Sequence, residues 1–78
     1  MQEAMTIGRL AKAAGVNVET VRYYQRRGLL REPNKPPGGH RRYSPAILRQ
    51  IGFIRHAQQL GFSLEEVKTL MESFKLPG

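Results

Sequence analysis

The 78-residue chain contains no cysteine. Disulfide bonds, cysteine metal ligands and thiol catalysis are therefore excluded within its own length. Long apolar runs are also missing, because no stretch approaches the roughly 20 residues that a membrane-spanning helix needs. The N-terminal segment MQEAMTIGRL lacks the basic-then-apolar order of a secretion signal. These absences predict a cytoplasmic chain that does not enter a membrane.

Acidic residues are scarce relative to basic ones. The chain has 13 Lys+Arg against six Asp+Glu, which gives a net charge of +7 and an isoelectric point near 10.6. Residues 17–43 hold seven basic and two acidic residues, so +5 of the +7 lies in this segment. A concentrated basic patch favours a polyanionic partner, and nucleic acid is the first candidate.

Groups that could perform catalysis are few. There are two histidines, His40 and His56, and the six acids are spread along the chain. An active site needs titratable groups that converge, and a metal site needs ligands at suitable spacing. The PPGG segment lacks the frame of a phosphate-binding loop. The sequence therefore predicts that the protein is not an enzyme and that this chain holds no metal or other cofactor.

Capping residues and apolar spacing predict a helix-turn-helix in residues 6–28. Thr6 is a suitable N-cap for a helix over Ile7–Ala14, and Gly15 would end that helix. Asn17 would cap a second helix over residues 18–27, which Gly28 would close. Two short helices joined by a tight turn containing glycine are typical of this motif.

The next segment, LLREPNKPPGGHRRYS, predicts a small β-hairpin, or wing, over residues 29–43. Leu29-Leu30 would begin one strand, and Arg41–Tyr43 would return beside it. Four consecutive prolines and glycines cannot be helical and force a turn between the two. Strands this short are not stable alone, so we expect the hairpin to lean on the helices.

Two further helices complete the prediction. Ser44-Pro45 is a strong helix start for residues 44–60, and Ser63 and Glu66 have the spacing of a capping box for a helix within residues 63–75. The expected inner side chains are Ile47, Ile51, Ile54, Ala57 or Gln58, and then Leu64, Val67, Leu70, Met71 and Phe74. The predicted fold is mainly α: a winged helix-turn-helix domain of about four helices over residues 6–76, after a tail of residues 1–5.

The second helix would divide its side chains between two faces. Val18 and Val21 should face the first helix, and Tyr24 should be partly buried with its hydroxyl directed at a phosphate. Tyr23 should be the more exposed of the two adjacent tyrosines. Arginine can bond bidentately to guanine or contact phosphate, and threonine and tyrosine hydroxyls commonly contact phosphate. The side chains that point outward from this helix are Glu19, Thr20, Arg22, Tyr23, Arg26 and Arg27, and DNA is the partner that best explains all of them except Glu19.

The blocks TIGRLAKAAGVNVETVRYYQRRGLL, GGHRRYS and LGFSLEEV occur in an order and spacing that resembles the DNA-binding domain of the MerR family of bacterial transcription regulators. The likeness covers nearly all of residues 6–74. AKAAGVNVET and YQRRGLLREP look especially like the mercury-responsive branch. The resemblance implies that two copies bind a palindromic operator inside a promoter with an overlong spacer. Effector binding would then distort the DNA for RNA polymerase.

The resemblance also implies roles for individual residues. Arg22 would enter the major groove, and the wing would contact the flanking DNA backbone. Glu19 departs from the basic residue that some members carry, and His40 stands where many have tyrosine. The residue Arg55 is interpreted either as an ordinary surface residue or as a phosphate contact. The full predicted DNA-binding set is Thr20, Arg22, Tyr23, Tyr24, Arg26, Lys35, His40, Arg41, Arg42, Tyr43 and Arg55.

Family members continue into a dimerisation helix and an effector-binding segment. The resemblance ends before both, so we expect neither of them within these 78 residues. We therefore expect either a fragment or a short natural relative, monomeric alone and weak on a half-site. Hg(II) or another metal would concern only a longer parent protein. Two alternatives remain: an excisionase-like architectural DNA-binding factor, and a basic module that docks on an acidic protein such as a polymerase subunit.

Overall fold

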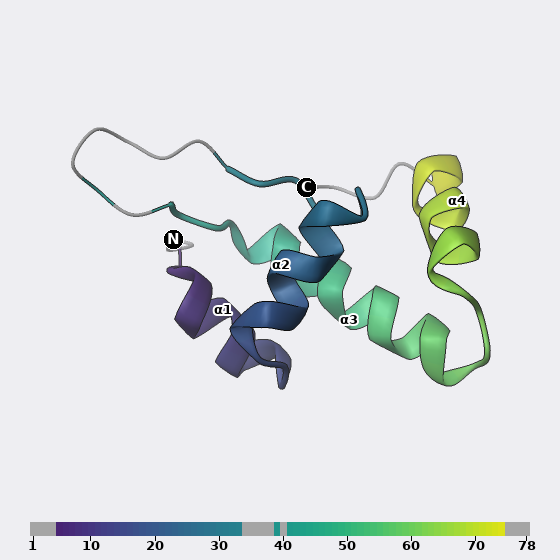
Figure 1. The fold of residues 1–78 in the computed structure, drawn as a ribbon, viewed down its shortest axis with the longest axis horizontal. Coiled ribbons are helices and arrows are strands. Elements are labelled where there is room, and N and C mark those ends of the chain that lie inside the picture. Colours follow the sequence, from purple (N-terminus) through teal and green to yellow (C-terminus); the bar gives the residue numbers. More distant parts are fainter. Residues whose placement is uncertain (1–4, 34–38, 40, 75–78) are drawn as a thin grey trace.

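The computed structural model describes residues 5–33, 39 and 41–74 and contains four helices in these ranges. They are α1 (Ile7–Ala14), α2 (Val18–Arg26), α3 (Pro45–Gln59) and α4 (Leu64–Phe74). In Figure 1, α1 and α2 lie over one part of α3, and α4 packs near its other end. All four predicted helices are present, with α2 and α3 each one residue shorter at the C-terminal end. None of the described helices is long and apolar enough to span a membrane.

Each of the two helices of the helix-turn-helix begins with the predicted side-chain cap, and Gly15 ends the first of them. The Thr6 hydroxyl oxygen accepts from the Arg9 amide at 3.3 Å, and the Asn17 side chain accepts from the Thr20 amide at 2.8 Å. Gly15 adopts a positive φ of 73°, where a residue with a Cβ is strained. Both predicted caps are therefore confirmed, and the turn sets the angle at which α2 leaves α1.

The start of α4 also has the predicted capping box. The Ser63 amide donates to the Glu66 carboxylate at 2.9 Å, and the Glu66 amide donates to the Ser63 hydroxyl at 3.2 Å. At the start of α3, by contrast, Ser44 makes no side-chain capping bond. Its extended backbone and the proline that follows it, whose fixed φ suits a first helical turn, begin that helix instead.

One apolar core holds the four helices together. Leu10 of α1, Val21 of α2, Ile51 and Ile54 of α3 and Val67 of α4 are each 0% exposed. Full burial of a side chain of this size stabilises the fold by about 1.5–3 kcal/mol. Because every helix contributes to this core, the outer face of α2 has a fixed orientation relative to the rest of the domain.

The inner side of α3 agrees with the predicted pattern, and one of its two alternatives is decided. Ala57 is 5% exposed and belongs to the core, whereas Gln58 is exposed. The sequence analysis did not predict the burial of Gln50, which is 7% exposed. On α4, Leu64 and Met71 pack against the core. The side chain of Phe74 lies outside the described residues.

The predicted two-stranded wing is not confirmed, because the described part of residues 29–43 contains no strand. Leu29 and Leu30 are both buried, whereas successive side chains of a strand point to opposite faces. Tyr43 pairs instead with Met5 in an isolated antiparallel bridge, with N···O distances of 2.8 and 2.7 Å. The backbone partner of Tyr43 is therefore Met5, and the predicted pairing of the returning segment with Leu29-Leu30 is not confirmed.

Side-chain contacts nevertheless join the two limbs of the segment between α2 and α3. The Arg41 Nε donates to the Pro33 carbonyl at 3.0 Å and lies 3.5 Å from the Glu32 carboxylate. Residues 34–38 and His40 lie outside the described residues, so the predicted DNA contacts of Lys35 and His40 do too.

Candidate nucleic-acid interface

The side chains of α2 divide between core and solvent as predicted. Val21 and Tyr24 are buried, and Tyr23 is 38% exposed. Arg22, Arg26 and Arg27 are also exposed, as is Glu19. The helix and its C-cap Arg27 therefore present three arginines and a tyrosine outward, while Val21 and Tyr24 belong to the core.

The first turns of α2 carry two local hydrogen-bonded pairs. The Arg22 Nη1 donates to the Glu19 carboxylate at 2.8 Å, and both side chains are exposed. The Thr20 hydroxyl donates to the Asn17 side-chain oxygen at 2.9 Å. Arg22 is thus directed along the outer face of α2, and Thr20 strengthens the cap at its N-terminus.

Tyr23 is the centre of a cationic cluster. The guanidinium carbons of Arg26 and Arg27 lie 5.9 and 5.8 Å from the centre of its ring. Arg27 also donates to the Tyr23 hydroxyl at 3.1 Å and to the Glu65 carboxylate of α4 at 2.9 Å. Arg27 therefore connects the outer face of α2 with α4. The sequence analysis missed this link, because it joins residues 38 positions apart and no local pattern indicates it.

Tyr24 is more deeply buried than predicted, at 5% exposed. Its hydroxyl donates to the Gln58 side-chain oxygen at 3.1 Å. Burial raises the pKa of this hydroxyl above its ordinary value, and the nearby positive charge of Arg55 partly opposes the rise. In this structure the hydroxyl proton is directed at Gln58, so a phosphate would have to replace that acceptor.

Tyr43, for which the resemblance implies a DNA contact from the wing, is a core residue. Its side chain is 2% exposed, and its hydroxyl oxygen accepts from the Gln25 amide at 2.9 Å. The neighbouring Arg42 is exposed, and Arg41 is partly buried by its contacts with the opposite limb. Of the Tyr43 side chain, only the hydroxyl is therefore placed where it could face a ligand.

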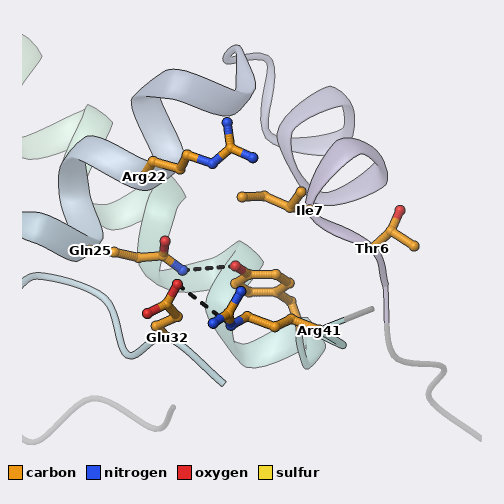
Figure 2. A pocket seen from close by; sticks show the side chains of 7 residues that line it. Thr6, Ile7, Arg22, Gln25, Glu32 and Arg41 are labelled. Atoms are coloured by element: carbon orange, nitrogen blue, oxygen red, sulfur yellow. Dashed lines mark hydrogen bonds and ion pairs between the residues drawn. The ribbon is translucent and has the colours of Figure 1, made fainter. Parts of the chain in front are cut away.

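A hollow of about 330 Å³ lies between α1, α2 and the segment that follows α2. Figure 2 shows Arg22 and Gln25 on the α2 side, Thr6 and Ile7 on the α1 side, and the Glu32–Arg41 pair on the third side. Two arginines and four further hydrogen-bonding side chains thus surround an open concavity. It is lined by Thr6, Ile7, Arg22, Gln25, Glu32, Arg41 and Tyr43.

Arg55 has a structural contact that neither predicted interpretation included. Its Nη1 donates to the Ala14 carbonyl at 3.1 Å, at the last residue of α1. A cation near the C-terminal end of a helix satisfies carbonyls that have no partner within the helix and complements the helix dipole. Arg55 therefore ties α3 to the turn that orients α2.

A family model described as MerR HTH family regulatory protein matches residues 5–73 of this chain. Among curated proteins, a mercuric resistance operon regulatory protein from Shigella flexneri is 59% identical over 69 residues, which are 88% of this chain and 48% of that protein. The HTH-type transcriptional regulator ZntR of Escherichia coli K12 is 45% identical over 65 residues, 83% of this chain and 46% of its own length. The chain thus spans about half the length of these relatives.

Solved structures show the same fold. The regulator PbrR691 from Ralstonia metallidurans, solved in complex with lead(II), is 37% identical, with a TM-score of 0.83 over 91% of this chain and 56% of its own. HiNmlR, a MerR family regulator lacking the sensor domain and bound to promoter DNA, has a TM-score of 0.81 over 96% of this chain and 57% of its own. Its 24% identity supports the fold alone. Since the named relatives are regulators, the prediction that the protein is not an enzyme is confirmed. The chain belongs to the MerR family of helix-turn-helix regulatory proteins.

Proposed function

We propose that this chain is the part of a MerR-type transcription regulator that binds double-stranded DNA at a bacterial promoter. The observation that carries the proposal is the outer face of α2 and its C-cap, where Arg22, Tyr23, Arg26 and Arg27 are exposed and Arg22 also lines the hollow. The major groove admits an α-helix, and arginine is the residue that most often recognises guanine there. The fold it shares with a regulator solved on promoter DNA is consistent with this role.

The proposed contacts follow from exposure. Arg22 reads base edges, because its side chain is 53% exposed on the outer face of α2. Arg26, Tyr23 and Arg42 contact phosphates from exposed positions. These backbone contacts supply affinity that is independent of sequence and sensitive to salt. Thr20, Tyr24, Arg41 and Tyr43 already have partners within the protein, so each can contact DNA only with its remaining donor or after exchanging a partner.

The larger assembly is also part of the proposal. In a longer parent protein, two such domains bind a palindromic operator and distort its spacer, which affects RNA polymerase indirectly through the DNA. That parent protein acts in the cytoplasm, and a metal effector such as Hg(II) binds to a part of it outside this chain. An excisionase-like factor would instead bind tandem, non-palindromic sites cooperatively, so the arrangement of selected sites distinguishes the two roles.

The test uses fluorescence anisotropy with promoter-length duplexes over a series of salt concentrations. Binding should weaken linearly on a log–log plot, with a slope of about −0.9 for each phosphate contact. Arg22→Ala should cost about 1–3 kcal/mol and relax the sequence preference. Arg42→Ala, the matched removal of an exposed arginine, should weaken all sequences alike and reduce the slope by about 1.

Two outcomes would contradict the proposal. If Arg22→Ala bound every duplex as tightly as the unmodified chain, Arg22 would have no role in base recognition. If DNA produced no chemical-shift changes in residues 18–26, the basic face would serve another partner. An acidic protein surface that shifted the same residues would then favour the protein-docking alternative.

A further inference from the structure

Glu19 is the single acidic residue of α2 and lies in its first turn. Its carboxylate accepts from the Arg22 Nη1 at 2.8 Å, with 72% of the Glu19 side chain and 53% of the Arg22 side chain exposed. The pair therefore projects from the outer face of α2 and is accessible from solvent. If this face enters a DNA groove, Glu19 enters together with Arg22.

Folding alone gives a weak reason for an acid at this position. A carboxylate in the first turn complements the helix dipole, but Asn17 already caps α2 through the Thr20 amide at 2.8 Å. An ion pair as exposed as that of Glu19 and Arg22 contributes little to stability. Beside the phosphates of DNA, a carboxylate would also lower affinity, because like charges repel. Glu19 is therefore costly for binding unless DNA offers it a hydrogen-bond donor.

The major-groove edge of a G·C base pair offers such a donor. It presents two acceptors on guanine, N7 and O6, followed by the cytosine N4 amine. A guanidinium carries five N–H donors, so the bond from Nη1 to Glu19 leaves the Arg22 Nε and Nη2 donors available. Arg22 and Glu19 together present donors followed by an acceptor, which complements that edge in the same order.

We infer that Glu19 and Arg22 act as one recognition unit, in which Arg22 binds guanine and Glu19 accepts from a cytosine N4 amine of the same or the adjacent base pair. This inference rests on the proposed function, because it requires α2 to lie in the major groove. It makes Glu19 a specificity-determining residue. At an A·T pair the carboxylate would face the O4 acceptor of thymine, and the resulting repulsion rejects that pair.

The experiment first selects a preferred half-site from random duplexes at low salt, where phosphate contacts are strongest. Each cytosine of that half-site is then replaced singly by N4-methylcytosine, which still pairs with guanine but loses the amine hydrogen that faces the major groove. Dissociation constants are measured for the unmodified chain, for Glu19→Ala and for Glu65→Ala. Glu65 is the matched control, because it is also an exposed acid paired with an arginine, at 2.9 Å from Arg27.

We expect one cytosine whose N4-methylation weakens binding by the unmodified chain and by Glu65→Ala about tenfold. The same modification should weaken Glu19→Ala less than about twofold, because that variant lacks the acceptor. The inference is overturned if no N4-methylation weakens the unmodified chain, or if Glu19→Ala is equally sensitive. The second result would assign the effect to the bulk of the methyl group. If the unmodified chain selects no sequence at all, the proposed function itself fails, and that outcome is distinct from both.

Discussion

Replacing Tyr43 by phenylalanine tests whether this residue belongs to the core, as the structure places it. Its ring is 2% exposed, and its hydroxyl makes one hydrogen bond, from the Gln25 amide at 2.9 Å. The two backbone bonds to Met5 do not depend on the hydroxyl. Phenylalanine keeps the ring and the bridge, so the expected loss is that of one partly buried hydrogen bond, about 0.5–1.5 kcal/mol.

That loss corresponds to a fall in melting temperature of roughly 4–8 °C per kcal/mol for a domain of this size. Tyr43→Ala, which also removes the ring, should cost about 3–5 kcal/mol. Thermal and urea unfolding followed by far-ultraviolet circular dichroism measures both variants. Combining Tyr43→Phe with Gln25→Ala gives the coupling energy of the pair. A Tyr43→Phe variant as stable as the unmodified chain, with additive effects in the double variant, would refute the hydrogen bond. A mild effect of Tyr43→Ala would refute the core role.

Three further predictions concern the rest of the domain. Gly15→Ala should lose about 1–2 kcal/mol of stability, because the φ of Gly15 is +73°. Gly52→Ala, inside α3, should gain about 0.5–1 kcal/mol, because an added Cβ there meets nothing within 4 Å. Urea unfolding compares the two variants, and equal effects would contradict the backbone strain at Gly15. Burial raises the pKa of the Tyr24 hydroxyl in the folded protein. The stabilisation that follows from this shift should be complete below about pH 10 and be lost as the pH rises through the folded-state pKa. An ultraviolet titration should show a late-ionising tyrosine that is missing in Tyr24→Phe. Glu65→Gln removes the ion pair with Arg27 and should change stability by less than about 1 kcal/mol. Because Arg27 is then free to contact phosphate, the variant should bind all DNA sequences more tightly. Weaker binding in fluorescence anisotropy would contradict this.

Local signals explain why the helices could be predicted from the sequence. The caps Thr6 and Asn17 act within three residues of their own position, and the apolar spacing of α1 and α2 is set by the helix period. The same period placed Val21 inward and Arg22 outward, so the basic face of the candidate site was also predictable.

Contacts between distant segments could not be predicted in this way. No local pattern indicates the burial of Tyr43, whose backbone pairs with Met5, 38 positions away in the sequence. Arg27 was predicted to be one more exposed cation, because nothing near it in the sequence indicates its bond to Glu65. The proline–glycine turn predicted the wing, and the family resemblance supplied roles for individual residues. It did not indicate which hydroxyls and guanidiniums are already bonded within the protein.

The bridge between Met5 and Tyr43 closes residues 5–43 into a ring that contains α1, α2 and the segment after them. Its two backbone bonds cannot persist if either end of the ring unfolds, so opening of the N-terminal end and detachment of Tyr43 from the core become one event. The amide protons of Met5 and Tyr43 should therefore exchange with solvent at a common rate, and slowly for a residue so near the start of the chain. Loss of the Met5 pairing would act on the segment beside α3 as much as on α1, which makes Met5 part of the cooperative unit that holds α2 in place.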